Sequence, residues 1–581
     1  MLSWKIGGDQ GEGIDSTGDI LIHTANRLGY YIYGYKSFSS RIKGGHTNYK
    51  MIMANRPISA TTQKTDILVA LTPQTITLNS QEINGGIIVA DQAYSPSLPQ
   101  GTDAMLVSLA LSQMAKEIGS PVMRNMIAAG ASAALLGFPL EVIAQYVEKR
   151  FQFKAPSIIE ANRRALHAGY QAMLQETARL PWLPSLESPH PGERVVMTGN
   201  DATCLGALAA GCRIMSGYPI TPATDIMESL TKYFPMVGGA VLQMEDELAS
   251  ITCAIGAGFA GARAMTATSG PGLSLMQEAI GLASMTETPV VIVDTQRAGP
   301  STGMPTKSEQ SDLLALIYGG HGEGPRIVIA PSSVEETFED AYEAFNLAEH
   351  FQAPVIIATD LSLALWQQSV ERKAIDGPHI PIDRGEVYSS SEIGESASFQ
   401  RYAFTADGIS PRTLPGTAAG QFLATGVEHG VEGKVSEDPL NRSRMMDKRF
   451  KKIGGIHDLR PPIRHEGLRD AEVALLGIGS VTGINKEARI LLEQSGLKTA
   501  VVWLRTLSPF PSSQCQDLLA KTRHIVVVEQ NATGQISQLL KMANVFDSRY
   551  HSLTKYDGVP FFAEDVARFT QNLLTQLEVK H

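Results

Sequence analysis

The stretch from Ser216 to Thr306 most constrains what this chain can fold into, because it repeats one pattern four times. Each repeat is a short apolar run followed by a loop, and three of the loops hold hydroxyls or charged groups beside glycines and prolines. Apolar runs separated by helical stretches are typical of parallel strands covered on both faces. Parallel strands present such loops along one edge, where α/β proteins bind ligands, so we interpret this edge as the site. The loops are Ser216-Gly-Tyr-Pro-Ile-Thr-Pro222, Gln243-Met-Glu-Asp-Glu247, Thr268-Ser-Gly-Pro-Gly272 and Asp294-Thr-Gln-Arg-Ala-Gly-Pro-Ser-Thr-Gly-Met-Pro-Thr306.

The same alternation extends over most of the 581 residues, so we predict a multidomain α/β protein. The expected parts are an α/β domain (1–180), a proline-rich linker (181–192), a doubly wound parallel domain (193–371), an irregular segment (372–465) and a C-terminal α/β domain (466–581). The second domain is expected to begin with a strand over Arg194 to Met197. A long irregular segment is unusual inside a compact domain, so we expect it to cover a neighbour or a partner chain.

Composition excludes several classes of protein. The net charge of −10 argues against a nucleic-acid surface, which needs a clustered basic face. We find no window near the roughly 20 apolar residues of a spanning helix, and no signal-peptide pattern at the N-terminus. The cysteines at 204, 212, 253 and 515 form no C-x-x-C pair, so we expect no iron–sulfur or zinc site in this chain. Few, scattered cysteines also fit a reducing compartment, and we expect a cytoplasmic protein.

The first domain opens with a strand and a glycine-rich turn, Trp4-Lys-Ile-Gly-Gly-Asp-Gln-Gly-Glu-Gly13. Backbone amides in such a turn can approach a phosphate, but a tight turn without a ligand explains the sequence equally well. The basic loop Ser39-Ser-Arg41-Ile-Lys43-Gly-Gly45-His46 comes later. A solvated turn and a contact for an anionic ligand or a neighbouring subunit both remain open for this loop.

Glu247 begins a predicted helix that is rich in small residues, so another backbone or a flat ligand can come close to it. A carboxylate in the first turn of a helix is stabilised by the helix dipole. Taken alone, Glu247 would be interpreted as an ordinary helix-start acid, a role that Glu245 and Asp246 could share.

The motifs together are far more specific than Glu247 alone. The chain from Tyr218 to Thr306 resembles the pyrimidine-binding domain of thiamine-diphosphate enzymes, specifically the α subunit of 2-oxoacid:ferredoxin oxidoreductases. The first domain resembles the γ subunit of these enzymes, and the last resembles the transketolase-like C-terminal domain of the α subunit. The arrangement is therefore similar to a fused γ–α subunit, and its α portion is most like the 2-oxoglutarate branch. The resemblance depends on Tyr218-Pro-Ile-Thr-Pro222, Glu247 with Gly256, Thr266-Ala-Thr-Ser-Gly-Pro-Gly272, Arg297 with Gly299-Pro-Ser-Thr-Gly303 and Pro305-Thr306, Gly7-Gly8 with Gly11, Arg41 with Gly44-Gly45, and Lys555-Tyr-Asp-Gly-Val-Pro-Phe561.

The resemblance implies a cofactor site of thiamine diphosphate. In this family a glutamate hydrogen-bonds the aminopyrimidine ring, and Glu247 matches that catalytic position by its spacing to Gly256. Tyr218, Pro219 and Ile220 match the cofactor-binding loop.

It also implies a site for an anionic 2-oxoacid, which needs a positive charge and hydroxyl donors. Arg297 would supply the charge and Thr221 a hydroxyl for the substrate carboxylate. Thr302 and Thr306 share a loop with Arg297 and are candidates for binding the rest of the substrate. A surface salt bridge is the competing interpretation of Arg297.

Parts of such an enzyme are missing from the sequence. We find no Gly-Asp-Gly with a suitably placed Asn and no cysteine cluster, and in the family the diphosphate, Mg²⁺ and [4Fe-4S] sites lie on a separate β subunit. We therefore expect this chain to hold no metal, to be incomplete alone, and to work with a β subunit in an (αβ)₂ heterotetramer that reduces ferredoxin. Coenzyme A would be the acyl acceptor, with Arg41 and Lys43 as candidate contacts.

The implied reaction is the CoA-dependent oxidative decarboxylation of 2-oxoglutarate to succinyl-CoA and CO₂, reversible as the reductive carboxylation of a reductive TCA cycle. Pyruvate or another 2-oxoacid remains an alternative, because the loops recognise the 2-oxoacid group more surely than its tail. A non-catalytic scaffold that binds CoA or a nucleotide is an alternative from another class. The joint presence of Glu247, Arg297 and Thr221 counts against that scaffold.

Overall fold

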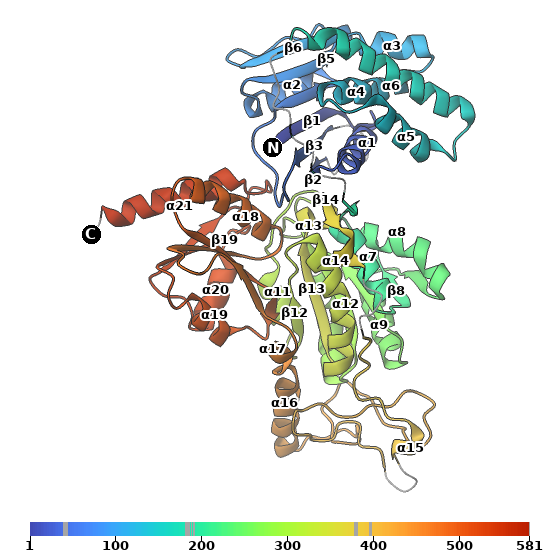
Figure 1. Ribbon diagram of the computed structural model, residues 1–581. Helices are drawn as coiled ribbons and strands as arrows, with labels where there is room; N and C mark the ends of the chain where they lie inside the picture. Colours follow the sequence, from blue (N-terminus) through green and yellow to red (C-terminus); the bar gives the residue numbers. More distant parts are fainter. Residues whose placement is uncertain are drawn as a thin grey trace. The chain divides into compact units, whose positions relative to one another are not determined.

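The structure is a computed structural model that describes residues 1–38, 45–180, 186, 189, 192–376, 381–393 and 398–579. The chain folds into two compact units (Figure 1). Unit 1 contains residues 1–197 and 366–373, and unit 2 contains residues 198–365 and 374–581. Most of the predicted linker over 181–192 lies outside the described residues.

Unit 1 is built on an eight-stranded mixed sheet. Across the sheet the strands are β6 (Ala104–Leu109), β5 (Gly86–Asp91), β4 (Ile67–Ala70), β1 (Leu2–Asp9), β3 (His46–Ala54), β2 (Tyr31–Ser37), β14 (Gln367–Glu371) and β7 (Arg194–Met197). The half from β6 to β1 is parallel, and the remaining strands pair antiparallel. The principal helices on this sheet are α1 (Ile14–Arg27), α4 (Arg124–Leu135), α5 (Leu140–Phe151) and α6 (Pro156–Thr177).

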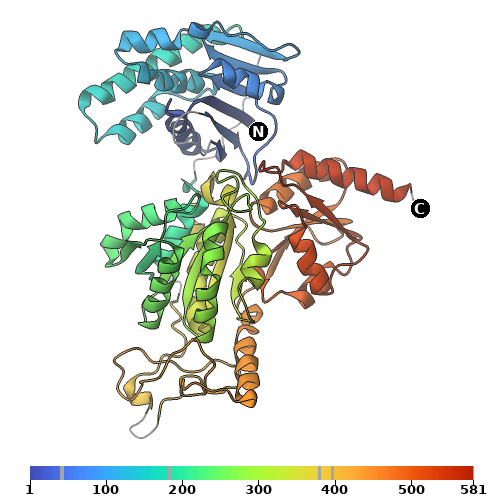
Figure 2. The same cartoon turned by 180° about the vertical axis from the view of Figure 1, so that it is seen from behind.

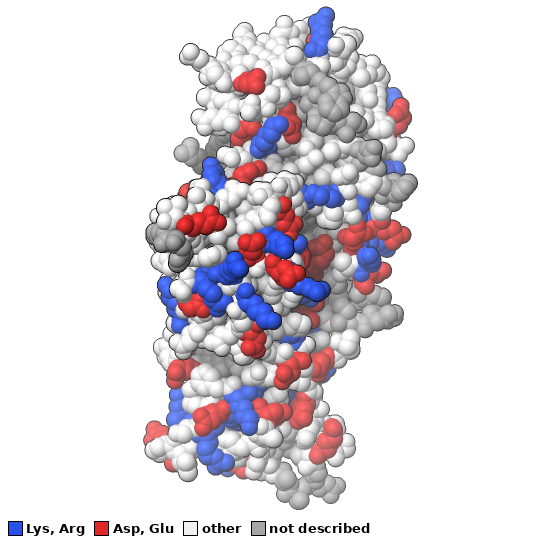
Figure 3. Space-filling model, turned by 60° about the vertical axis from the view of Figure 1, so that its left-hand side comes forward, with Lys and Arg blue, Asp and Glu red and all other residues white. Residues whose placement is uncertain are grey.

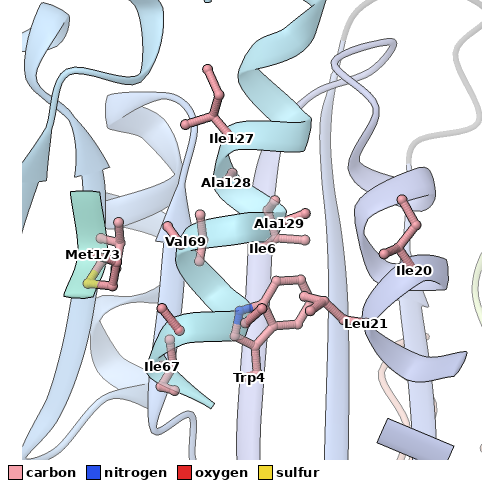
Figure 4. Close-up of a cluster of buried hydrophobic side chains, with 14 of the residues drawn as sticks. Trp4, Ile6, Ile20, Leu21, Ile67, Val69, Ile127, Ala128, Ala129 and Met173 are labelled. Carbon is pink, nitrogen blue, oxygen red and sulfur yellow. The ribbon is translucent and has the colours of Figure 1, made fainter. Parts of the chain in front are cut away.

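The core of unit 1 lies between β1 and these helices (Figure 4). Trp4, Leu21 and Ile127, from β1, α1 and α4, are fully buried in it. The indole Nε1 of Trp4 donates to Ser132 Oγ of α4 at 3.0 Å, so its only polar group has a partner inside the core.

The strand predicted over Arg194 to Met197 is present, but the expectation that it begins the second domain is wrong. It is β7, and it pairs antiparallel with β14 at the edge of the unit 1 sheet, with Val195 opposite Val370. An apolar run specifies a strand but not its neighbour, because the partner here comes from a segment about 170 residues later in the chain.

Unit 2 contains the parallel sheet predicted from the four repeated loops. Its order is β18 (Thr506–Ser508), β12 (Ile327–Ile329), β13 (Pro354–Asp360), β11 (Val290–Gln296), β10 (Ala264–Thr268), β8 (Ile214–Gly217) and β9 (Ala240–Gln243). All neighbours are parallel except β18, which pairs antiparallel with β12.

Helices cover both faces of this sheet, as expected of a doubly wound fold. Helices α7 (Gly199–Ala209), α8 (Thr224–Tyr233) and α12 (Val334–Phe351) share a core with one face, which is seen in Figure 1. Helices α9 (Glu247–Phe259) and α10 (Gly270–Met285) share a core with the other face, which is seen in Figure 2.

A second sheet in unit 2 confirms the C-terminal α/β fold. Its strands, in spatial order, are β15 (Ile463–Glu466), β17 (Thr499–Leu504), β16 (Val473–Gly477), β19 (His524–Glu529) and β20 (Tyr550–Thr554). Only β15 runs antiparallel to its neighbour. Helices α18 (Gly479–Gln494), α20 (Gln535–Met542) and α21 (Ala563–Glu578) belong to the same part of the chain.

The segment over 372–465 is not wholly irregular as predicted, because it contains the 15-residue helix α16 (Pro439–Ile453). Asp438 caps the helix by accepting hydrogen bonds from two backbone amides, and a proline occupies its first turn. The buried face of α16 includes Lys448, Arg449 and Lys452. Because that face carries charges, the sequence lacks the apolar period from which a helix is normally recognised.

Lysine and arginine side chains are interspersed with aspartate and glutamate over the face drawn in Figure 3. In the described part of the chain, no helix combines the length and the apolar character needed to cross a membrane.

Candidate active site

Strands β8, β9, β10 and β11 are adjacent and parallel, so the loops that follow them lie along one edge of the sheet. This is the arrangement that the sequence predicts. Two hydrogen bonds connect the first loop with the second loop and with the helix that follows it. The Met244 amide donates to Gly217 O at 3.0 Å, and Ser216 Oγ donates to Ser250 O at 2.6 Å. The end of β8 is therefore joined to the first turn of α9, which Glu247 begins.

Glu247 is the first residue of α9, and its side chain is largely buried. The preceding residue, Asp246, is the N-cap and accepts a hydrogen bond from the Ala249 amide at 2.8 Å. The two neighbouring acids therefore have different roles. Asp246 caps the helix, so Glu247 is not needed as its N-cap.

The Glu247 carboxylate lies against the first turn of α10. A Cβ atom added at Gly272 would stand 2.7 Å from Glu247 Oε1 and 2.0 Å from Thr268 Oγ1. Only glycine allows the carboxylate this position, because any side chain would displace it. A carboxylate held at the edge of a parallel sheet, beside a glycine-rich helix start, fits the hydrogen-bonding requirement of an aminopyrimidine ring.

Arg297 joins two of the loops. It is 6% exposed, its Nη1 donates to Thr221 O at 2.6 Å, and its Nη2 donates to Thr302 O at 3.2 Å. Burial lowers the pKa of its guanidinium, while the carboxylate of Asp312 opposes that shift. A surface salt bridge is therefore the wrong interpretation of Arg297. These two bonds use two of the five N–H groups of the guanidinium, so three N–H groups remain for other acceptors.

The loop after Arg297 is a tight hairpin. Met304 N donates to Ala298 O, and Ala298 N donates to Lys307 O, both at 2.9 Å. Gly303 has a φ of +55°, and an added Cβ would meet Ala298 O at 2.0 Å, so this position requires glycine. Thr302 is exposed and Thr306 half-buried on this loop.

The C-terminal α/β part of unit 2 supports the same loop. Gln530 Nε2 donates to Ser308 O at 2.8 Å, and the Gln310 amide donates to Gln530 O at 2.8 Å. Gly558, with a φ of +72°, packs so closely that an added Cβ would lie 2.8 Å from Met304 Cε and 2.9 Å from Lys307 Cβ. The C-terminal part therefore helps to position the loop that Arg297 begins.

The other predicted residues have fewer contacts in the structure. Tyr218 is 42% exposed, and Pro219 and Ile220 are half-buried in the loop between β8 and α8. Their roles as cofactor contacts stay predictions. Arg41 and Lys43 lie outside the described residues.

Two buried acids that received no role from the sequence also lie in this region. Asp294 near the end of β11 is fully buried, and among the described residues neither of its carboxylate oxygens has a hydrogen-bond partner. Burial, reinforced by the charge of Asp312, raises the pKa of Asp294 well above its usual range. Burial also raises the pKa of Asp312 to about 6, with Arg297 opposing the shift and Glu309 adding to it. The sequence feature that could have indicated Asp294 is its position as an acid near the end of an apolar strand.

Unit 1 has a pocket of about 380 Å³ beside its glycine-rich turn. Gly11, Glu12, Lys116 and Arg124 are among the residues that line it. Arg124 forms an ion pair with Glu12, and its Nη1 lies 3.5 Å from Asp91, so its charge is largely balanced. In the ranges that the structure describes, no three His, Cys, Asp or Glu side chains are grouped as metal ligands.

Three protein families match successive parts of the chain. The family described as pyruvate ferredoxin/flavodoxin oxidoreductase matches residues 3–172. The thiamine-diphosphate-binding family of pyruvate flavodoxin/ferredoxin oxidoreductases matches residues 205–447. The core domain II of pyruvate:ferredoxin oxidoreductase matches residues 471–566.

Individual relatives match the chain from end to end. The α subunit of 2-oxoacid:ferredoxin oxidoreductase 2 from Aeropyrum pernix is 34% identical, over 99% of this chain and 98% of its own. The 2-oxoglutarate oxidoreductase subunit KorA from Mycobacterium tuberculosis is 32% identical, over 98% of this chain and 91% of its own.

A solved structure shares the whole fold. It is the 2-oxoglutarate:ferredoxin oxidoreductase from Magnetococcus marinus with 2-oxoglutarate, coenzyme A and succinyl-CoA bound. It superimposes with a TM-score of 0.91 and 34% identity, over 98% of this chain and 99% of that one. Sequence and fold agree along the full length, and this chain belongs to the 2-oxoacid:ferredoxin oxidoreductase family, as a subunit with a thiamine-diphosphate-binding domain.

Proposed function

We propose that this chain is the γ–α subunit of an enzyme that converts 2-oxoglutarate and coenzyme A to succinyl-CoA and CO₂. Two electrons leave the substrate and pass singly to ferredoxin. The observation that carries the proposal is the junction of Thr221, Arg297 and Thr302 by hydrogen bonds, at the sheet edge where Glu247 also lies. A similar structure that holds 2-oxoglutarate, coenzyme A and succinyl-CoA supports this choice of substrates.

Glu247 is proposed to hold the aminopyrimidine ring of thiamine diphosphate by a hydrogen bond. The bound cofactor supplies the electron sink for decarboxylation. Because the Glu247 carboxylate is confined by Gly272 and by the rigid start of α9, it does not have to be reoriented when the cofactor binds. Tyr218, Pro219 and Ile220 are proposed to line the cofactor from the loop after β8.

Arg297 is proposed to bind the carboxylate next to the keto group, with the Thr221 hydroxyl as a second donor. A guanidinium can present two parallel N–H groups to a carboxylate, which gives geometric as well as electrostatic selectivity. Thr302 and Thr306 are proposed to contact the distal part of the substrate, since both are at least partly accessible on the Arg297 loop.

The coenzyme A contacts are proposed to lie in unit 1, with Arg41 and Lys43 as the basic residues. The described end of their loop supports this, because Gly45 O accepts a hydrogen bond from the Gln10 amide at 3.1 Å. The basic loop and the glycine-rich turn therefore meet at that point. Backbone amides and basic side chains together are the usual partners of phosphate groups.

The remaining parts of the enzyme are proposed to come from a β subunit in an (αβ)₂ assembly. That subunit would hold the diphosphate, Mg²⁺ and the [4Fe-4S] cluster. The cytoplasm is the proposed location.

The test is to replace Glu247 with Gln in the complex reconstituted with the β subunit. Glutamine keeps the size of the side chain but cannot act as a carboxylate. We expect CoA-dependent reduction of ferredoxin to fall at least about 100-fold, in line with loss of a catalytic proton-transfer group. Glu245→Gln is the matched control, because Glu245 is an exposed acid two residues away and should keep full activity.

Substrate identity is tested by comparing kcat/KM for 2-oxoglutarate and pyruvate in the wild-type complex. A preference for pyruvate would overturn the proposed substrate and leave the reaction class intact. Unchanged turnover in Glu247→Gln would overturn the assigned role of Glu247. A wild-type complex that binds coenzyme A but turns over neither acid would favour the scaffold alternative.

A further inference from the structure

A buried acidic pair lies beside the proposed substrate site. Asp294 follows Val290 and Ile292 on the same face of β11, and those two residues pack in the core shared with α9 and α10. Its carboxyl group therefore points toward the helix layer that contains the start of α10. The alternate residues, Val291 and Val293, pack in the core on the opposite face.

Asp312, from the segment before α11 (Leu313–Tyr318), lies near the same face of β11 and the start of α10. Its backbone amide donates to Gln296 Oε1 at 3.1 Å, and Gln296 stands two residues after Asp294 on the same face of β11. A Cβ added to Gly270, the first residue of α10, would lie 2.7 Å from Asp312 Oδ2 and 3.1 Å from Oδ1. The first turn of α10 carries no acidic residue, so its positive dipole end favours one carboxylate here.

The surroundings cannot neutralise two carboxylates. Both oxygens of Asp294, Oδ2 of Asp312, and the hydroxyls of Thr266 and Ser269 are buried without hydrogen-bond partners among the described residues. Two buried carboxyl groups that repel each other avoid double ionisation when one of them stays protonated. The neighbouring cation is Arg297, which affects the pKa of Asp312 and is affected by it.

Several acids also lie on the described elements near the pair. Glu309, on the loop of Asp312, raises the pKa of that residue further. Asp360 of β13 already accepts hydrogen bonds from Gln310 Nε2 and the Ser480 amide. Glu247 is the acid from α9, and α20 contributes the neutral Gln535, whose amide Nε2 donates to Ser311 O at 2.7 Å. Arg297 is the cation that lowers the pKa of Asp312, so an anion bound at Arg297 would weaken that effect.

We propose that Asp294 and Asp312 hold one proton while the site is free, and take up a second proton when an anionic substrate binds at Arg297. The inference rests on the proposed role of Arg297 in substrate binding. In the free site Asp294 is neutral, and the charge of Asp312 offsets part of the charge of Arg297 without a direct ion pair. A substrate carboxylate at Arg297 brings a second negative charge close to Asp312, and a proton from solvent then neutralises the Asp312 carboxylate. Both aspartates are thus positioning residues that act through Arg297.

The direction of the pH effect follows from the pKa of Asp312. Below about pH 6 this carboxyl is already protonated, so the substrate binds without proton uptake. At higher pH, binding has to include a proton, because a second negative charge near Asp312 raises the pKa of that residue. The affinity for the substrate therefore falls as pH rises above about 6, and levels off once the pH exceeds the raised pKa.

The first experiment measures KM for 2-oxoglutarate between pH 6 and pH 8 in the reconstituted complex. For wild type we expect KM to increase about tenfold, the equivalent of one pKa unit of coupling. Asp312→Asn should show a nearly constant KM, and at pH 8 it should bind more tightly than wild type. Asp312→Glu should restore the pH dependence, and Asp458→Asn, at an exposed acid in the same unit, should match wild type.

The second experiment measures the proton directly and leaves the pair unchanged. The Glu247→Gln complex, which is expected to bind the substrate without turnover, is titrated with 2-oxoglutarate at pH 7 in two buffers of different ionisation enthalpy. We expect a fraction of a proton to be taken up per site, and none in the Glu247→Gln, Asp312→Asn double variant. Binding without proton uptake, or equal pH dependence in wild type and Asp312→Asn, would overturn this inference alone. Absence of 2-oxoglutarate binding would overturn the proposed function as well.

Discussion

Arg297 Nη1 donates a hydrogen bond to the backbone oxygen of Thr221 at 2.6 Å, across 76 positions of the sequence. A second bond from the same guanidinium reaches Thr302 O. Arg297 therefore sets the separation of the two loops on either side of the proposed substrate carboxylate. Its proposed role as a substrate ligand depends on this structural role, because the two bonds hold the guanidinium plane in one orientation.

Replacing Arg297 with Lys should test that dependence. Lysine keeps the charge but cannot bridge two carbonyl groups and still present a planar pair of donors. We expect KM for the 2-oxoacid to rise about 10- to 100-fold, which corresponds to losing one or two charge-assisted hydrogen bonds. Steady-state kinetics of the reconstituted complex measure this, with Arg568→Lys at an exposed site as the control. An unchanged KM would mean that charge alone is required.

Gly272→Ala should displace the Glu247 carboxylate, because the new methyl group would lie 2.7 Å from Oε1. We expect activity to fall about tenfold or more and thiamine diphosphate to bind more weakly, since the carboxylate can no longer take its position. The measurements are activity and cofactor titration of the complex.

Gly281→Ala is the matched control on the same helix, α10, because an added Cβ there meets no atom within 4 Å. It should keep full activity and stabilise the helix by a few tenths to about 1 kcal/mol. Equal losses in the two variants would show that helix packing, and not the Glu247 contact, is responsible.

Gly558→Ala should disturb the substrate loop from the C-terminal part of unit 2. The added methyl group meets Met304 and Lys307, and the residue would also have to keep a φ of +72°. We expect KM for the 2-oxoacid to rise several-fold with a smaller change in kcat, because the loop moves while Glu247 does not. Gly496→Ala has the same type of backbone, with a φ of +89°, but open space around it. It should cost about 1 kcal/mol of stability and leave KM unchanged.

The cluster at the end of α10 predicts an effect on stability. Glu287 is fully buried and accepts hydrogen bonds from Lys448 Nζ at 2.6 Å and from Lys452 Nζ at 3.1 Å, both on α16. Glu287→Gln leaves two buried lysines without a counter-ion and should destabilise unit 2 by about 3–5 kcal/mol. Lys452→Met keeps the Lys448 pair and should cost less, which denaturant unfolding of the purified chain can compare.

This cluster also has a defined pH dependence. Burial lowers the pKa of Lys452 to about 7, from the usual 10.5 of a free lysine. Between these two values the unfolded chain binds more protons than the folded chain, so stability should increase as pH rises from 7. Unfolding curves at pH 7 and pH 9 should show a larger increase in wild type than in Lys452→Met, which keeps Lys448, whose pKa is also lowered by burial. The same increase in both proteins would assign it to other groups.

The positions of the strands along the chain, and the sheet edge at which their loops lie, were open to prediction because their causes are local. Apolar runs such as Val290 to Val293 specify buried strands, and parallel strands necessarily place their following loops at one edge. The start of a small-residue helix at Glu247 was predicted for the same reason. The role of Glu247 came from the family resemblance, whose motif it matches by its spacing to Gly256.

Other features depended on contacts between distant segments. The sequence could not show that β7 pairs with β14, because the apolar pattern of a strand carries no information about its partner. Helix α16 was not predicted because part of its buried face is charged. Lys448 and Lys452 are buried in ion pairs with Glu287, so apolar residues do not recur with the helical period. The family assignment was confirmed along the whole chain, whereas the roles of the individual site residues, Glu247, Arg297 and Thr221 included, stay predictions.

The sequence by itself determined an α/β protein, and it predicted a site at one sheet edge with Glu247, Thr221 and Arg297 as its residues. Only the tertiary structure showed that Arg297 donates hydrogen bonds to both Thr221 and Thr302, and that the Glu247 carboxylate packs against Gly272. It also showed that Asp312 lies on the face of β11 that carries Asp294. The physical reason is that a strand or a helix start is specified by neighbouring residues. The charge state and orientation of a side chain are instead set by groups that folding brings from elsewhere in the chain.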